Sequence, residues 1–176
     1  MDVLLTERLR LRPFTLDDAP ALFELFALPE VARWSGTGQP MTDLSQARER
    51  IERMPARAGS YPSCGQFFTE RRDTGEFVGN TLLVPLPASA GVDRSDFEVG
   101  WHLHPRAWGH GFATEAAAAL LSRGFDAGMT EIYAVTDPEN VRSQAVCRRL
   151  GMTDLGLSKD WYDTELRGFR AVPAAA

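Results

Sequence analysis

Three titratable side chains in the middle of the chain are spaced so that they can act together. Glu98, His102 and His104 are separated by even numbers of residues in the segment FEVGWHLH, which alternates apolar and polar positions. On a β-strand, even spacing places side chains on one face. Because a carboxylate and two imidazoles can accept protons near neutral pH, this face suits general base chemistry.

A glycine pair follows this segment at the point where an extended stretch meets an alanine-rich one. Gly109 and Gly111 flank His110, just before a helix expected to begin at Phe112. Glycine lets a backbone approach a ligand closely, and the first N–H groups of a helix have no partner inside it. The turn therefore predicts an anion site, most simply for a phosphate, in residues 108–113. The alternative is a tight turn that binds nothing, because the pair lacks the further glycine of a dinucleotide fingerprint and the ending of a Walker loop.

The elements around these residues follow from periodicity. Residues 97–104 are expected to form a strand, with Phe97, Val99, Trp101 and Leu103 on its apolar face. A helix is expected from Phe112 to about Ala127, capped by Gly128. After it we expect a strand at 131–136, a helix from about 141 ended by Gly151, and a closing hairpin.

The first half of the chain predicts mixed elements. It begins with a strand at 8–14 and a helix opened by Thr15 and Asp18 at capping-box spacing. A Gly- and Pro-containing loop at 33–42 precedes a charged helix from Thr42 to about Met54, which Pro55 is expected to stop. A hairpin at 66–84 follows.

Length and charge narrow the function class. The 176 residues predict one domain, 1–176, with a core at about 6–172 and a short Ala-rich C-terminal tail. The net charge of -5 gives no basic footprint, so we expect no nucleic-acid partner and favour cationic acceptors such as amines.

Cysteine usage and hydropathy indicate the compartment. Cys64 and Cys147 are too few and too far apart for a disulfide framework or a zinc site, so we expect free thiols and no metal. Neither a signal peptide nor a long apolar run is evident in the sequence, which predicts a cytoplasmic protein without a membrane partner.

The order of these motifs resembles a known family. The segment EVGWHLHPRAWGHGFATEA, followed downstream by DPENVRSQAVCRRLGM, is similar to the GNAT N-acetyltransferases, and nearest to the RimJ/RimL-like branch, which acetylates protein N-termini. TERLRLRPFTLDDAPALFELF and DTGEFVG extend the resemblance over about residues 6–170. It implies an α/β fold with a mixed, mostly antiparallel sheet of six or seven strands, about four helices and splayed central strands. It also implies acetyl-CoA as co-substrate and direct transfer to an amine, and relatives that are often dimers make a homodimer an expectation.

The resemblance assigns the cofactor residues. Arg106, Gly109 and Gly111 match the family's Arg/Gln-x-x-Gly-x-Gly/Ala loop for the pyrophosphate, and Asn140 with Ser143 matches its Asn-x-x-Ser. The pantetheine arm is expected between the strands around 101–103 and 132–135. The full expected set is Trp101, His102, Leu103, Arg106, Trp108, Gly109, His110, Gly111, Phe112, Ala113, Asn140 and Ser143.

Catalytic roles are expected on the strand and on the second helix. Glu98 is our candidate general base, with His102 or His104 as alternatives unless they are structural or a strand bulge shifts their facing. The family's tyrosine acid falls on Cys147, so Ser143 is expected to replace it. Cys147 is otherwise a packing residue or, less simply, a nucleophile.

The acceptor pocket is expected from Trp34, His104, Trp161 and Tyr162, although these aromatic residues could equally fill the edge of the core. The acceptor is expected to be a protein or peptide N-terminus. Small-molecule amines such as antibiotics or polyamines, or a non-catalytic role in binding acyl-CoA, are the alternatives.

Overall fold

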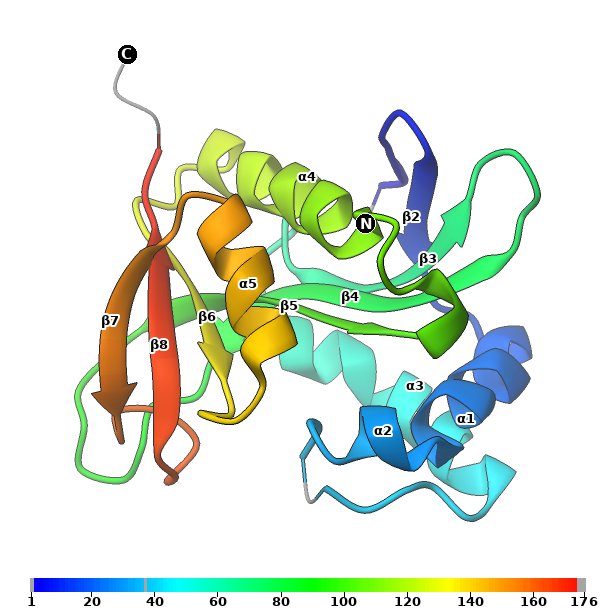
Figure 1. The fold of residues 1–176 in the computed structure, drawn as a ribbon, viewed down its shortest axis with the longest axis horizontal. Coiled ribbons are helices and arrows are strands. Elements are labelled where there is room, and N and C mark those ends of the chain that lie inside the picture. Colours follow the sequence, from blue (N-terminus) through cyan, green and yellow to red (C-terminus); the bar gives the residue numbers. More distant parts are fainter. Residues whose placement is uncertain (1, 37, 174–176) are drawn as a thin grey trace.

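The computed structural model describes residues 2–36 and 38–173, and within them one mixed sheet organises the chain. Its strands lie in the order β1-β2-β3-β4-β5-β6-β8-β7 (Figure 1). The strands are β1 (Leu4–Leu5), β2 (Leu9–Pro13), β3 (Gly65–Arg71), β4 (Phe77–Leu86), β5 (Asp96–Leu103), β6 (Ile132–Thr136), β7 (Thr153–Ser158) and β8 (Leu166–Ala171). Neighbouring strands pair antiparallel except β5 and β6, which are parallel. The predicted fold class is confirmed, and the described residues hold eight strands because the two-residue β1 adds to the edge.

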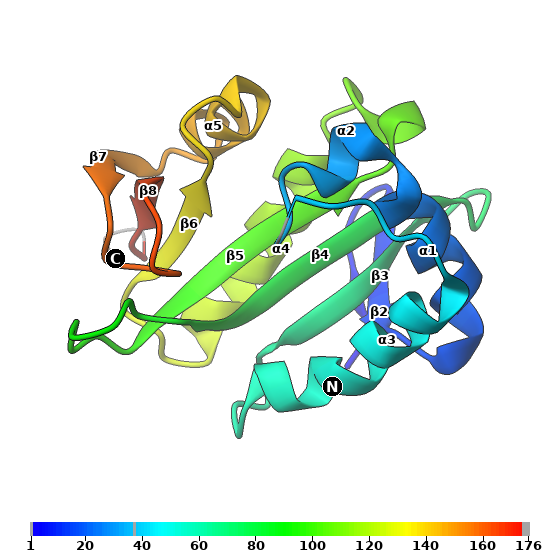
Figure 2. The same ribbon diagram turned by 90° about the horizontal axis from the view of Figure 1, so that it is seen from below.

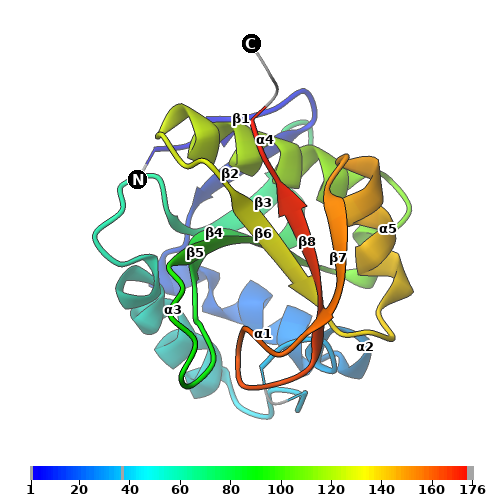
Figure 3. The same cartoon turned by 90° about the vertical axis from the view of Figure 1, so that its left-hand side faces the viewer.

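Helices cover both faces of the sheet. They are α1 (Ala19–Ala27), α2 (Pro29–Ala32), α3 (Leu44–Ala58), α4 (Phe112–Asp126) and α5 (Val141–Arg149), with 3₁₀ turns η1 (Leu16–Asp18) and η2 (Pro105–Ala107). α1, α2 and α3 lie on one face and α4 on the other, while α5 lies beside β6 (Figures 1 and 3). The Ala-rich tail at 174–176 lies outside the described residues.

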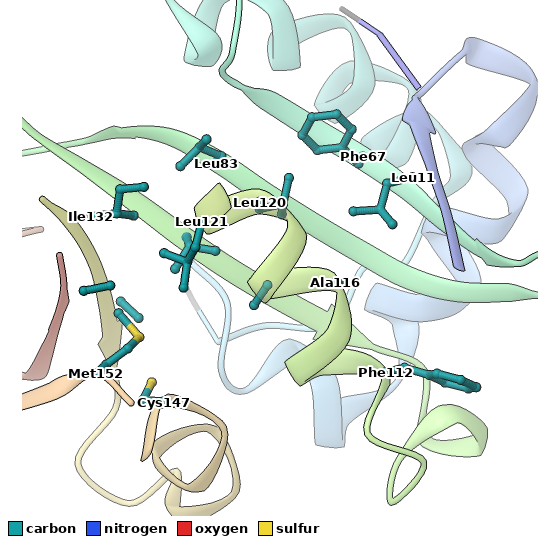
Figure 4. Packing of buried hydrophobic residues seen from close by; sticks show 14 of the residues in the cluster. Leu11, Phe67, Leu83, Phe112, Ala116, Leu120, Leu121, Ile132, Cys147 and Met152 are labelled. Carbon is teal, nitrogen blue, oxygen red and sulfur yellow. The ribbon is translucent and has the colours of Figure 1, made fainter. Parts of the chain in front are cut away.

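Two buried clusters fill the space between these layers. The larger lies between the sheet and α4 and includes Leu11, Phe67, Leu83 and Leu120 (Figure 4). The second joins α1 and α3 to the opposite face of the sheet, through residues such as Phe26 and Ile51. Each cluster removes apolar surface from water, so the sheet is held rigidly from both sides.

Helix α3 corrects the prediction that Pro55 ends it. The helix continues to Ala58 and stops at Gly59, whose φ of 63° leaves the helical region. A proline removes only the one hydrogen bond that its own N–H would make, to the carbonyl of Ile51. Ile51 and Met54 bury their side chains and hold the last turn in place. The extra turn matters because it carries Arg57. The four-residue helix α2 was not predicted.

The predicted splay of the central strands is present. β6 pairs with β5 at a single position, Glu98 opposite Tyr133, and the two strands then diverge (Figure 2). On its other side β5 pairs with β4 in unbroken register from Asp96 to Leu103, so this strand has no bulge. The sheet therefore opens on one side of β5 just after Glu98, and the expected facing of its side chains is preserved.

Candidate active site

The loop between β5 and α4 has the backbone geometry of an anion site. Gly109 and Gly111 have φ values of 80° and 79°, in the left-handed region that side chains disfavour. Gly111 is the N-cap of α4, and no side chain caps the helix there. The first N–H groups of α4 therefore face the loop without a side-chain acceptor, as a phosphate ligand requires. This arrangement fits the pyrophosphate of acetyl-CoA, whose binding here stays a prediction.

A side chain that sequence reasoning missed braces this loop. Arg8, in the turn between β1 and β2, donates from Nη1 to the carbonyl oxygen of His110 at 3.0 Å. Its Nη2 atom also lies 2.6 Å from Oε2 of Glu115, in the first turn of α4. The acidic residue in that first turn is favourable because of the helix dipole, but nothing in the sequence links it to Arg8.

Two predicted site residues before the loop have partners inside the protein. The Arg106 guanidinium forms ion pairs with Glu24 at 3.3 Å and Glu76 at 3.1 Å. Nε2 of His104 lies 3.3 Å from Glu24, while its Nδ1 accepts from the Arg106 N–H at 3.3 Å. Burial and then the charge of Arg106 lower the pKa of His104. Both side chains therefore fasten the loop to α1 in this structure.

Three more of the predicted cofactor residues lie close to the start of α5: Trp108, Asn140 and Ser143. Trp108 donates its indole N–H to the carbonyl oxygen of Leu103 at 2.8 Å, and Arg142 lies over its ring at 4.8 Å. Asn140 caps α5, its Oδ1 accepting from the N–H of Ser143 at 3.1 Å. The structure thus brings the end of β5, the glycine loop and the α5 N-terminus together around the opening beside β6.

A polar cluster around a buried carboxylate lies at the point where β5 and β6 part. Tyr162 donates from its hydroxyl to Oε2 of Glu98 at 2.5 Å. Arg57 reaches the same oxygen at 3.4 Å and donates to the Tyr162 hydroxyl at 2.6 Å. Three distant elements contribute: β5, the last turn of α3, and the segment between β7 and β8. We call Arg57, Glu98 and Tyr162 the carboxylate cluster.

The electrostatics of the carboxylate cluster suit a proton acceptor. Glu98 is 9% exposed, and its burial raises the pKa of its carboxyl, while Tyr162 and Arg57 act in the opposite direction. Burial and the charge of Glu98 raise the pKa of Tyr162, so the hydroxyl remains protonated and continues to donate. A carboxylate with a raised pKa is a stronger base than one in water, which is what general base catalysis needs near neutral pH.

His102 is a poor base in this structure. Burial, and then the charge of Arg50, lowers its pKa to about 3, so the ring is neutral at physiological pH. The ring packs against Phe26 at a centroid distance of 5.2 Å. Its Nδ1 is buried with no hydrogen-bond partner among the described residues. The expectation that His102 serves as an alternative base is therefore disfavoured on physical grounds.

Cys147 is a packing residue in the structure. It is fully buried and lies beside Met152 in the cluster under α4 (Figure 4). Burial raises the pKa of its thiol to about 12, so almost none of it is thiolate, the form that a nucleophile requires. Ser143 is partly exposed one turn earlier on α5, where its hydroxyl makes no hydrogen bond within the described residues.

The aromatic residues expected in the acceptor pocket lie in three different environments. Trp161 is 2% exposed, packs with Leu86 and Tyr133, and donates its indole N–H to Asp96 at 2.9 Å, so it fills the core edge. Tyr162 joins the carboxylate cluster. Trp34 is partly exposed, with the Arg33 guanidinium 4.2 Å from its ring centroid. Trp161 is therefore closed to an acceptor, whereas Trp34 and Tyr162 are both partly exposed.

Arg57 is a second candidate site residue that the sequence did not predict. The buried positions of α3 are Ala47, Ile51 and Met54, and Arg50 and Arg57 continue the same spacing of three and four residues. An arginine at a position that continues the spacing of buried residues indicates a polar function on that face of the helix. The helix was expected to end before Arg57, so this indication was not used.

Comparison with known proteins decides the family. The family model described as "Acetyltransferase (GNAT) domain" matches residues 8–153. The chain belongs to the GNAT acetyltransferases. This GNAT chain is 32% identical to the "uncharacterized N-acetyltransferase p20" of Bacillus licheniformis, over 92% of this chain and 88% of the relative. It is 30% identical to the "FsC-acetyl coenzyme A-N(2)-transacetylase" of Aspergillus fumigatus, over 90% of this chain and 68% of that protein.

Solved structures agree with this GNAT assignment. An acetyltransferase from Agrobacterium tumefaciens superposes with a TM-score of 0.78 at 28% identity, covering 98% of this chain and 95% of that one. RimL, a "Ribosomal L7/L12 alpha-N-protein acetyltransferase" solved with coenzyme A, superposes with a TM-score of 0.78 at 16% identity, covering 97% and 98%. RimJ of Mycobacterium smegmatis also shares the fold, with a TM-score of 0.74 at 23% identity, covering 93% of this chain and 81% of that one. The family match and the N-acetyltransferase relatives show that the enzyme is an acyltransferase.

Two further features concern metal ligands and membrane-spanning helices. In residues 2–36 and 38–173, no three His, Cys, Asp or Glu side chains come close enough together to form a metal site. Over the same ranges, none of the helices has both the length and the apolar composition needed to span a membrane.

Proposed function

We propose that this GNAT enzyme transfers acetyl from acetyl-CoA directly to the α-amine of a protein or peptide N-terminus. The observation that carries the proposal is the carboxylate cluster, which places a buried, hydrogen-bonded Glu98 where the sheet opens beside β5. The glycine loop lies at the other end of that opening. A proton acceptor and an anion site are therefore linked by one cleft between strands.

We assign each step of the acetyl transfer to a different part of the chain. Bound acetyl-CoA supplies the acetyl thioester. Main-chain N–H groups of β5 after Glu98 have no strand partner on the β6 side, and we assign to residues 99–101 the polarisation of the thioester carbonyl. The amine nitrogen forms the new bond to the acetyl carbon as the bond to sulfur breaks. Glu98 takes the amine proton, directly or through one water, and the Ser143 hydroxyl donates a hydrogen bond to the departing thiolate.

The choice of an N-terminal amine rests on chemistry and on the neighbours. At pH 7 about one α-amine in seven is neutral, against roughly one lysine in 2,500, so an α-amine needs less help from a single carboxylate. The printed name of RimL, an α-N-protein acetyltransferase with the same fold, supports the same acceptor.

Thiol release from acetyl-CoA tests this proposal. The panel contains peptides with free N-termini, the same peptides blocked at the N-terminus but containing lysine, and polyamines and aminoglycosides. We expect release with free N-termini alone. Release with small amines alone would replace the proposal by a small-molecule acetyltransferase, and no release with any acceptor would favour a non-catalytic acyl-CoA-binding module.

A further inference from the structure

Arg50, on the buried side of α3, carries a charge that no carboxylate balances. Its guanidinium lies 3.9 Å from the centroid of the Phe26 ring and 3.5 Å from the Ser35 hydroxyl, and it forms no ion pair within the described residues. By contrast Arg12, which also lies over a phenylalanine of the same cluster, is paired with Asp18 at 2.7 Å. An enclosed cation without a counter-ion is costly, because burial disfavours the charged form.

The surroundings of Arg50 make the imbalance larger. The charge of Arg57, two turns along the same helix, acts on Arg50, and the neighbouring imidazole of His102 is neutral. Burial, followed by the charge of Arg57, lowers the pKa of Arg50 to about 10, which still leaves the guanidinium protonated at neutral pH. The local field is therefore positive and would be relieved by an anion.

Arg50 lies at the wall of a cavity that could admit such an anion. The cavity has a volume of about 240 Å³ and lies between α1, α2, α3 and residues 35–36 and 39–41. Its wall includes Phe26, Ala32, Ser35, Met41 and Arg50. This volume is below the roughly 300–1,000 Å³ of pockets that enclose a whole small ligand, so it suits one acidic side chain.

The cavity lies on the same face of the sheet as the carboxylate cluster. Glu98 and His102 point from β5 toward α3, where Arg57 meets Glu98 and Arg50 lies near His102. Two turns of helix separate Arg50 from Arg57, which is about 10 Å along the axis. An extended peptide covers that distance with about three residues.

We propose that Arg50 determines acceptor specificity by binding a carboxylate side chain within the first three residues of a peptide whose α-amine lies at Glu98. This inference rests on the proposed function, because it assumes an amine acceptor with a following chain. The guanidinium forms a charge-assisted pair with the carboxylate inside an open cavity whose wall carries both polar and apolar side chains. Arg50 is thus a binding residue for the acceptor and not for acetyl-CoA.

Steady-state kinetics with matched peptides test the proposal. Peptides that differ only by Asp or Glu against Asn or Gln at the first, second or third residue are compared as acceptors, with thiol release as the readout. We expect the best acidic peptide to exceed its amide counterpart by about 10- to 100-fold in kcat/KM. In Arg50→Gln this preference is expected to disappear through KM, with kcat for the acidic peptide kept within about twofold.

Two variants separate recognition from folding. Arg50→Lys keeps the charge and is expected to restore part of the preference, whereas Arg53→Gln on the same helix, where Arg53 is exposed and paired with Glu49, should behave as wild type. Equal kcat/KM for acidic and amide peptides in the wild type would overturn the proposal. It would also be overturned if Arg50→Gln lowered both equally, since that result indicates a structural role.

A binding measurement keeps this inference distinct from the proposed function. Nitrogen-15 spectra of the arginine Nε groups are recorded as glutarate, or glutaramide at matched ionic strength, is added, and Arg50→Lys identifies the Arg50 signal. We expect that signal to move with glutarate only. If no peptide is acetylated but the signal moves, the proposed function fails and the carboxylate site stands. If the signal stays in place, the inference is wrong whatever the acetyl transfer shows.

Discussion

The glycine loop after β5 and the carboxylate cluster are built by different means. On the loop side, residues 104–113 form a contiguous segment whose candidate anion-binding groups are main-chain N–H groups, set by two positive φ angles at Gly109 and Gly111. On the other side, the carboxylate cluster depends on side chains from three elements that are far apart in sequence. The loop takes its conformation from its own glycines and is braced from outside by Arg8 and Glu24, whereas the cluster needs the whole fold to bring its members together.

This difference predicts how each side tolerates change. A backbone site accepts many side chains but not a change of dihedral angle. A cluster of three ionisable or hydroxyl side chains accepts small shifts of backbone but not the loss of one member, because the remaining buried groups lose their partners. Mutations in the glycine loop should therefore change the affinity for CoA, whereas mutations in the carboxylate cluster should change proton transfer.

The largest effect is expected on the cluster side, from Glu98→Gln. Replacing the carboxylate by an amide removes the base while keeping its size, so kcat/KM should fall by about 10²- to 10⁴-fold. Affinity for acetyl-CoA, measured by titration calorimetry, should not change. If kcat/KM is unaffected between about pH 6 and 9, Glu98 is not the base.

The next effect is expected on the loop side, from Gly109→Val. A β-branched residue at a φ of 80° is strained by about 1–3 kcal/mol, so the loop leaves its geometry and CoA affinity should fall about tenfold or more. Gly128→Val is the matched control, because Gly128 also has a positive φ, of 89°, but lies at the far end of α4. Both variants lose stability and only the first should lose affinity for CoA. If the two variants bind CoA with equal affinity, the loop is not part of the cofactor site.

A smaller effect, visible in a pH profile, is expected from Tyr162→Phe. The Tyr162 hydrogen bond lowers the pKa of Glu98 against the larger effect of burial, so its loss should raise that pKa further. The acidic limb of kcat/KM should then move to higher pH by about one unit. Tyr133→Phe is the control, since the Tyr133 hydroxyl bonds Glu131 and Arg94 instead. If the acidic limb of the kcat/KM profile does not move, the ionisation of Glu98 does not determine it.

The same shift has a consequence for stability. The pKa of Glu98 is higher in the folded than in the unfolded chain, so the stabilisation from its proton is complete below the unfolded pKa. It is lost as the pH rises through the folded pKa. In Tyr162→Phe the free energy of unfolding should therefore fall more steeply over that window, as denaturant titrations at several pH values would show.

The smallest effect on activity is expected from Cys147→Ala. A fully buried thiol with a pKa of about 12 takes no part in transfer, so kcat should be unchanged. The cavity left in the core should cost about 1–2 kcal/mol of the free energy of unfolding. Cys64→Ala, at the other buried cysteine, provides the comparison. A large loss of kcat in Cys147→Ala but not in Cys64→Ala would support the alternative that Cys147 is a nucleophile.

Local signals predicted the elements well. The alternation in β2 and β5, the capping box of Thr15 and Asp18, and the glycines that end α4 and α5 each depend on neighbours in sequence, and the structure contains all of them. The end of α3 was predicted wrongly for a related reason. The packing of Ile51 and Met54, which a local rule does not include, outweighs the cost of Pro55.

Side-chain partners were less predictable. Glu98 was recognised as a candidate base from its position, but its contacts with Arg57 and Tyr162 join residues 41 and 64 positions away. Trp161 and Tyr162 are neighbours in sequence, yet one fills the core and the other reaches the cluster. Tyr162 has a φ of 59°, a backbone conformation that no pattern in the sequence indicated.

By itself, the sequence determined the alternation of β5, the glycine loop with the helix after it, and through these motifs the resemblance to the GNAT family. These features are set by dihedral preferences and short-range hydrogen bonds, which neighbouring residues control. Only the tertiary structure decided that the sheet opens after Glu98, that Arg57 and Tyr162 meet this carboxylate, and that Arg50 lies beside a cavity without an ion pair to any described residue. Those outcomes depend on burial and on charges brought together by the packing of distant elements, which the order of residues does not reveal.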